Sequence, residues 1–159
     1  MMTKAEAAPR DAAPKGEREA PALRSSFPHF LPITTRWSDM DVYGHVNNVV
    51  YYAYFDTVVA EYLMRTDGVN PHESAAIGLV VETRCSYFQS LTFPETVEAG
   101  LRVVKLGNTS VRYEIGIFRQ GEDTASAQGY FVHVYVDRDT RRPVPLPEHL
   151  KRALAPLVV

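Results

Sequence analysis

The fold is decided by residues 48–65, which read NVVYYAYFDTVVAEYLMR. The stretch contains neither Gly nor Pro, and a helix of this length measures about 27 Å at 1.5 Å per residue. Its polar side chains Thr57, Glu61 and Arg65 recur at every fourth position, so they form one narrow stripe in which Glu61 can pair with Arg65. Because the remaining side chains are mostly apolar, the pattern predicts a long helix that is buried in a core.

Four further stretches alternate apolar and polar residues, as strands with one buried face do. Turn residues separate the four stretches. A fifth, short strand is expected at residues 31–37. A short C-terminal helix is expected to begin near Pro147. The predicted strands are residues 31–37, 79–88, 96–104, 110–119 and 124–137.

These elements predict an α+β domain in which a curled antiparallel sheet of about five strands wraps around one long central helix. Ten strand residues cover about 33 Å, which matches the length of the helix. A single sheet curled in this way leaves its edge strands unpaired. Pairing with further copies of the chain would cover them, so we expect a homodimer or homotetramer.

Composition limits the classes of function. The chain has 159 residues, of which 45% are hydrophobic and 23% charged, as in an ordinary globular protein. Residues 1–26 carry almost no large apolar side chains and are predicted to be a disordered tail, which leaves residues 27–159 as one domain. The net charge of −2 gives no reason to expect nucleic acid as a partner, and Cys85, the single cysteine, excludes a disulfide framework.

The sequence shows no membrane or export signal. No stretch approaches the roughly 20 apolar residues that span a bilayer. Lys4 and Glu6 come early in the chain, and no apolar signal segment follows them. We therefore expect a cytoplasmic protein without a membrane partner.

The chemistry is concentrated in residues 36–48, RWSDMDVYGHVNN, which lead into the predicted helix. A helix N-terminus offers unpaired N–H groups and a positive dipole end, which can stabilise an oxyanion formed at a carbonyl. A nearby carboxylate, Asp39 or Asp41, could attack that carbonyl or activate water. Gly44 allows the loop to approach a ligand closely or to adopt a positive φ. The arrangement predicts acyl transfer without a catalytic Ser, Cys or metal ion.

At this point the chain resembles a known family. The pattern resembles the signature of the 4-hydroxybenzoyl-CoA thioesterase branch of hotdog-fold enzymes, and its His-Val-Asn-Asn version is similar to bacterial long-chain acyl-CoA thioesterases. The resemblance extends through residues 80–88, 107–110 and 142–147. It implies a hotdog fold and hydrolysis of an acyl-CoA to free acid and CoA, without a cofactor. The residues that carry it are Asp39-x-Asp41-x-x-Gly44-His45-Val46-Asn47-Asn48-x-x-Tyr51-x-x-Tyr54-Phe55.

The resemblance also implies roles for individual residues. Asp41 would act as nucleophile or general base, and the backbone N–H of Asn48 would polarise the thioester carbonyl. His45 and Asn47 would position the water or the thioester, and Tyr51 would line the acyl pocket.

CoA carries phosphates, which cationic groups should meet. The turn at residues 107–110 could offer donors from Asn108, Thr109 and Ser110 to the pantetheine or the nucleotide. Basic side chains near turns or strand ends are also candidates: Lys105, Arg112, Arg138, Arg141 and Arg142.

Several alternatives remain open. Asp39 is interpreted as a structural residue that binds loop N–H groups, whereas Asp56 is a second candidate carboxylate, either catalytic or buried and hydrogen-bonded. Asp39, Asp41 and His45 could in principle bind a metal ion, but no second ligand cluster accompanies them, so no metal is expected. The substrate could be an acyl carrier protein thioester. The fold would also accommodate an enoyl-CoA hydratase or a non-catalytic acyl-CoA-binding domain.

Overall fold

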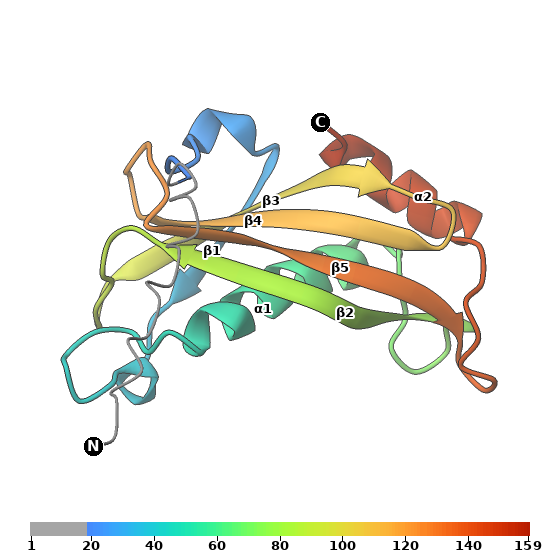
Figure 1. The fold of residues 1–159 in the computed structure, drawn as a ribbon, viewed down its shortest axis with the longest axis horizontal. Helices are drawn as coiled ribbons and strands as arrows, with labels where there is room; N and C mark the ends of the chain where they lie inside the picture. The colour runs from blue at the N-terminus through green and yellow to red at the C-terminus, as the bar shows by residue number, and fades with distance from the viewer. Residues whose placement is uncertain (1–18) are drawn as a thin grey trace, which may run out of the picture.

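A computed structural model describes residues 19–159 of the protein. Its helices and strands follow the pattern that the sequence predicts, with small shifts at their ends (Figure 1). In chain order the elements are η1 (Arg24–Ser26), β1 (His29–Thr34), η2 (Trp37–Asp39), α1 (Val50–Arg65), β2 (Ala76–Tyr87), β3 (Thr96–Leu106), β4 (Ser110–Arg119), β5 (Ala127–Asp137), α2 (Glu148–Leu154) and η3 (Ala155–Leu157).

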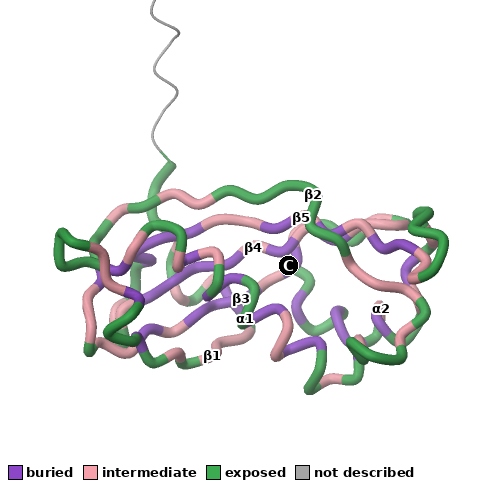
Figure 2. The backbone as a smooth tube through the Cα atoms, turned by 90° about the horizontal axis from the view of Figure 1, so that it is seen from below, coloured by how far each residue is buried: buried purple, intermediate pink, exposed green. Residues whose placement is uncertain are grey.

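The five strands form one antiparallel sheet in the order β1-β3-β4-β5-β2. Helix α1 runs along one face of the curled sheet, and α2 lies at the end near the C-terminus (Figure 1). The predicted curled sheet of five strands around one long helix is confirmed, as is the short C-terminal helix. Strand β2 forms one edge of the sheet, and most of its residues are exposed (Figure 2).

The core lies between α1 and the inner face of β3 and β4. Alternate residues of these strands face the helix because successive side chains of a strand point to opposite sides of the sheet. The register places Ala99, Leu101 and Val103 of β3 opposite Ile117, Ile115 and Tyr113 of β4. The inner residues Val97, Ala99, Leu101, Val103, Val111, Tyr113, Ile115 and Ile117 are completely buried.

Helix α1 begins at Val50, two residues later than predicted, because Asn48 and Val49 form a turn that leads into it. Only one face of the helix is buried in this chain. Its buried residues are Tyr51, Tyr54, Phe55, Val58, Val59, Tyr62 and Leu63. The prediction of a helix buried over most of its circumference is therefore wrong for the single chain. Each large side chain that it does bury contributes roughly 1.5–3 kcal/mol.

The predicted tail falls mainly on residues 1–18, which lie outside the described residues. Residues 19–26 pack against the sheet: Leu23 forms a bridge with Thr124, and the backbone N–H of Ala22 donates to Gln128. Within the described part of the chain, no helix is long and apolar enough to cross a bilayer.

Candidate active site

Asp41 lies in the loop between η2 and α1, and backbone groups of that loop fix its orientation. Its Oδ1 accepts hydrogen bonds from the N–H groups of Tyr43 (2.8 Å) and His45 (3.3 Å). The N–H of Asp41 in turn donates to the carbonyl of His45 at 2.8 Å. Gly44 closes this tight turn with a φ of 80°, which residues other than Gly rarely adopt. Oδ2 makes no hydrogen bond within residues 19–159, so half of the carboxylate stays available.

The loop is attached to the segment that follows β2. The N–H of Val46 donates to the carbonyl of Leu91 at 2.8 Å, and the Thr92 hydroxyl donates to the carbonyl of Gly44 at 3.1 Å. These two bonds hold the turn around Asp41 from outside. The position of Asp41 therefore depends on residues about fifty positions further along the chain.

Asp39 is structural, in agreement with its interpretation from the sequence. Its side chain is 1% exposed and accepts hydrogen bonds from the backbone and guanidinium of Arg36 and from the Tyr54 hydroxyl at 2.9 Å. Burial alone would raise the pKa of Asp39. The hydrogen bonds from Arg36 and Tyr54, together with the Arg36 charge, outweigh burial and lower that pKa below 3.8. The carboxylate is thus held ionised, and both of its oxygens accept hydrogen bonds.

Replacing Asp39 with Asn is expected to lower the free energy of unfolding by about 1–3 kcal/mol, because the buried Tyr54 hydroxyl and the Arg36 N–H groups lose a charged acceptor. Tyr54→Phe, which removes one of the hydrogen bonds, should cost about 1 kcal/mol. The carboxylate has a lowered pKa in the folded state, so its stabilisation is fully present above the unfolded pKa and is lost as the pH falls through the folded value. Urea unfolding at neutral pH and below pH 3.8 should show the gap between wild type and D39N shrinking in acid; a gap that is constant with pH would contradict the assignment.

The start of α1 presents a free backbone donor. Asn47 accepts hydrogen bonds from the two residues that follow Asn48. Its carbonyl accepts one from the N–H of Val50 (2.9 Å), and its Oδ1 accepts one from the N–H of Val49 (3.2 Å). The N–H of Asn48 has no acceptor within the described residues. The Tyr87 hydroxyl donates to the Asn48 carbonyl at 2.8 Å and holds this peptide against the end of β2.

Two open pockets meet at Asp41. One, which we call the Asp41 pocket, measures about 320 Å³ and is lined by Asp41, His45, Val46, Asn48, Tyr51, Tyr87, Phe88, Gln89 and Ser90. The other, which we call the loop pocket, measures about 750 Å³ and is lined by Trp37, Met40, Asp41, Val42, Tyr43, Gly44, Asn47 and Asn48. Both are bordered by Asp41 and Asn48, so both open onto the same carboxylate and the same helix start.

The structure thus brings together the predicted residues of the segment 36–51. Asp41, His45, Asn48 and Tyr51 line the Asp41 pocket, while Gly44 and Asn47 line the loop pocket. Tyr51 is 2% exposed, and burial raises its pKa to about 12, so the phenol stays neutral at physiological pH. Its ring packs edge-on against Tyr87, with 5.1 Å between the ring centroids.

The predicted turn at residues 107–110 lies elsewhere. It joins β3 to β4 at the opposite end of the sheet from the Asp41 loop (Figure 1), and β4 alone spans about 30 Å. Within one chain Asn108, Thr109 and Ser110 do not reach Asp41. Their role in substrate binding stays a prediction, and it would require the turn of a second copy.

The rival carboxylates separate clearly. Glu61 pairs with Arg65 at 2.8 Å, as predicted. Asp56 is exposed on α1 and lines neither pocket, so the alternative in which it is buried and hydrogen-bonded is wrong. Among residues 19–159, no group of three or more His, Cys, Asp or Glu side chains is placed to hold a metal ion.

One wall of the Asp41 pocket was not predicted. It comes from the end of β2 and the segment after it, and Tyr87 contributes a hydroxyl that reaches the start of α1. Residues 80–88 were noted only for their resemblance. Nothing in the alternation of a strand shows which helix terminus its end will meet. The residues of this wall are Tyr87, Phe88, Gln89 and Ser90.

Comparison with known proteins places this geometry in context. Residues 35–154 match the model of the Thioesterase-like superfamily. The crystal structure of the PA5185 protein from Pseudomonas aeruginosa strain PAO1 is similar, with a TM-score of 0.85 and 51% identity over 88% of this chain and 97% of that one. With the family match, this likeness confirms the predicted hotdog fold.

Two further relatives are informative. A thioesterase from Thermus thermophilus, crystallised with coenzyme A and Zn, has a TM-score of 0.69 and 30% identity over 83% of this chain and 95% of that one. The uncharacterized protein YsmA of Bacillus subtilis strain 168 is 24% identical over 132 residues, which cover 82% of this chain and 88% of YsmA.

Proposed function

Because the chain belongs to the thioesterase-like superfamily, we propose that it is an acyl-CoA thioesterase that hydrolyses an acyl-CoA to the free acid and CoA. Its place in the superfamily and the thioesterases among its structural relatives support hydrolysis of a thioester in general. The coenzyme A bound to the Thermus thioesterase favours CoA as the thiol, in preference to an acyl carrier protein.

One observation carries the proposal: a carboxylate oxygen and an N–H at the helix start, neither with a partner among residues 19–159, border the same pocket. The thioester carbonyl would lie in the Asp41 pocket and accept a hydrogen bond from the N–H of Asn48. The positive end of the α1 dipole would stabilise the oxyanion that develops there. Since backbone groups already fix Oδ1, the free Oδ2 is the atom that reacts.

Two routes lead from this geometry to products. In one, Oδ2 of Asp41 attacks the carbonyl carbon and expels the CoA thiolate, which leaves a mixed anhydride that water then hydrolyses. In the other, the carboxylate accepts a proton from the water that attacks the carbonyl carbon, and the C–S bond breaks with departure of the CoA thiolate. His45 at the pocket rim would orient the water or the thioester, and Tyr51 would contact the acyl group.

We propose that the protein belongs to the 4-hydroxybenzoyl-CoA thioesterase branch and prefers a long acyl chain, as the sequence resemblance implies. The apolar surfaces next to Asp41 support the preference for a long chain. Met40, Val42 and Tyr43 line the loop pocket, and the side chains of Val42 and Tyr43 are almost fully exposed in the single chain. An alkyl chain covering them would remove apolar surface from water.

Thiol release tests the proposal directly. The full chain is incubated with aromatic, short-chain and long-chain acyl-CoAs and with an acyl carrier protein thioester, and free thiol is measured. We expect release from at least one acyl-CoA, with long chains preferred. Loss of enoyl absorbance without thiol would instead indicate a hydratase, and thermal stabilisation by acyl-CoAs without turnover would indicate a binding domain.

We also propose that the protein is a homodimer or homotetramer. In the single chain β2 has a neighbour only on one side, and Leu79, Val80 and Val81 on this edge are exposed. An unpaired edge of this length is a template for strand pairing with a second copy. Sedimentation equilibrium should give a mass of at least twice 17.9 kDa; a monomer at micromolar concentration would contradict the proposal.

A further inference from the structure

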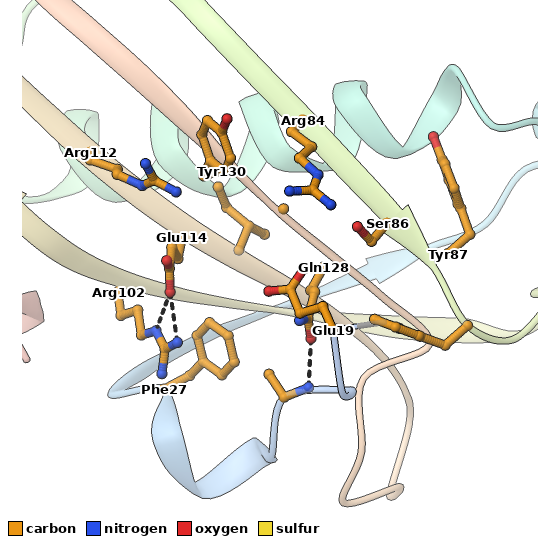
Figure 3. A pocket seen from close by; sticks show the side chains of 14 residues that line it. Glu19, Phe27, Arg84, Ser86, Tyr87, Arg102, Arg112, Glu114, Gln128 and Tyr130 are labelled. Carbon is orange, nitrogen blue, oxygen red and sulfur yellow. Dashed lines mark hydrogen bonds and ion pairs between the residues drawn. The ribbon is translucent and has the colours of Figure 1, made fainter. Parts of the chain in front are cut away.

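The outer face of the sheet, opposite α1, carries a cleft of about 610 Å³ (Figure 3). We call it the outer cleft; it is lined by, among others, Arg84, Tyr87, Phe88, Arg112 and Tyr130. Strand register places Arg84, Tyr130, Glu114 and Arg102 in one row across β2, β5, β4 and β3. Residues in such a row share a face of the sheet, and Ile115, next to Glu114, points to the core.

Two of the three arginines in this cleft are free to bind a ligand. Arg102 is neutralised by Glu114, with 2.6 Å between Nη2 and Oε2. The Arg112 guanidinium lies 3.8 Å from the centroid of the Tyr130 ring. Within the described residues neither Arg84 nor Arg112 forms an ion pair with a carboxylate. Figure 3 shows both pointing into the cleft on either side of Tyr130.

Two other polar side chains of the cleft form hydrogen bonds within the chain. The Tyr130 hydroxyl donates to Glu82, and the Gln128 side chain bonds the backbone at Ala22 and Ala20. Glu19 is the remaining carboxylate in the lining. The two unpaired guanidiniums therefore give the cleft its binding character, and guanidinium groups bind phosphate oxygens through strong charge-assisted hydrogen bonds.

The outer cleft and the Asp41 pocket lie on either side of the end of β2. Tyr87 and Phe88 line both of them. Arg84 lies three residues before Tyr87, about 10 Å along the strand. CoA has the same layout: its thioester and its phosphates are separated by the extended pantetheine arm.

We propose that the outer cleft binds the phosphates of the CoA nucleotide, with Arg84 and Arg112 as the phosphate-binding residues and Tyr87 and Phe88 beside the pantetheine arm. The inference rests on the proposed function and deepens it. It assigns phosphate recognition to Arg84 on β2 and Arg112 on β4. Arg112 is among the basic side chains that the sequence indicates as candidates, but Arg84 is not. It makes the nucleotide a determinant of KM, because these contacts lie far from the reacting carbonyl.

The test compares two substrates with the same acyl group, one on CoA and one on N-acetylcysteamine, which lacks the phosphates. Arg84→Gln and Arg112→Gln are each expected to raise KM for the acyl-CoA about tenfold and to leave kcat within about twofold, as for loss of one charge-assisted contact that does not change in the transition state. Hydrolysis of the N-acetylcysteamine ester should not change. Arg152→Gln, an exposed arginine on α2, is the matched control and should affect neither substrate.

Ionic strength gives an independent reading that needs no variant. For the wild type, added salt should raise KM for the acyl-CoA and not for the truncated ester, because salt screens exposed charge pairs. Equal effects of the Arg variants on both substrates, or unchanged KM values for the acyl-CoA, would overturn the outer cleft as the phosphate site while leaving the thioesterase assignment intact. A wild type that hydrolyses neither ester would instead refute the proposed function itself. Melting temperatures of all variants identify any that fail to fold.

Discussion

Asp41→Asn is expected to lower kcat for thioester hydrolysis by a factor on the order of 10²–10⁴ and to leave the melting temperature near that of the wild type. Asn retains an oxygen at the Oδ1 position, which can still accept the N–H groups of Tyr43 and His45. The loop should therefore keep its shape. The free Oδ2 becomes an amide nitrogen, which neither attacks a carbonyl nor accepts a proton from water.

Asp56→Asn is the matched control for this experiment. Asp56 lies on α1, is exposed and lines neither pocket, so this variant should keep near wild-type turnover. If D41N is folded and retains activity while D56N loses it, the assignment of the two carboxylates is reversed. Single turnover in oxygen-18 water then distinguishes the two chemical routes: label enters the Asp41 carboxylate only if that carboxylate is the nucleophile.

The second large effect is expected at Asn48, where the group that would stabilise the oxyanion is the backbone N–H. Asn48→Pro removes the N–H that has no acceptor within residues 19–159, and should lower kcat by about 10²–10³-fold, as for loss of an oxyanion donor. Asn48→Ala keeps that N–H and should lower kcat much less. The carbonyl of residue 48 still accepts from Tyr87 in both variants, so the contact that holds the peptide is preserved.

Comparison of the two Asn48 variants isolates the backbone donor. The quantities to measure are kcat, KM and the melting temperature of each, because Pro also restricts the backbone of the preceding residue. If the Ala and Pro variants lose activity equally, the Asn side chain, not the N–H, carries the effect. If neither loses activity, the helix start does not bind the oxyanion.

Much of the fold could be predicted because each element carries its own periodic pattern. Residues 96–104 and 110–119 alternate over most of their length, and β3 and β4 occupy them almost unchanged. The absence of Gly and Pro from residues 48–65 defined α1 to within two residues. Its burial was overestimated because apolar residues around a helix show that it must be covered, without showing whether the same chain provides the cover.

The candidate site also contains a part that the sequence predicts and a part that it does not. The residues from Asp41 to Tyr51 are neighbours in the chain, so a local motif could place them together. Tyr87 reaches the site only because β2 ends beside the start of α1, which is a property of the strand order. For the same reason the turn at 107–110 looked suitable from its donors alone, although β4 carries it to the far end of the sheet.

The way in which Asp41 is held has a consequence for how specificity can evolve. Its orientation depends on the N–H groups of residues 43 and 45 and on the backbone conformation of Gly44, and not on the side chains at positions 42 and 43. Those two side chains line the loop pocket and are largely exposed. If Asp41 and the loop pocket act as proposed, mutations there would alter the surface offered to the acyl group while the carboxylate stays in place. Substrate range would then diverge between related proteins without loss of the hydrolytic step.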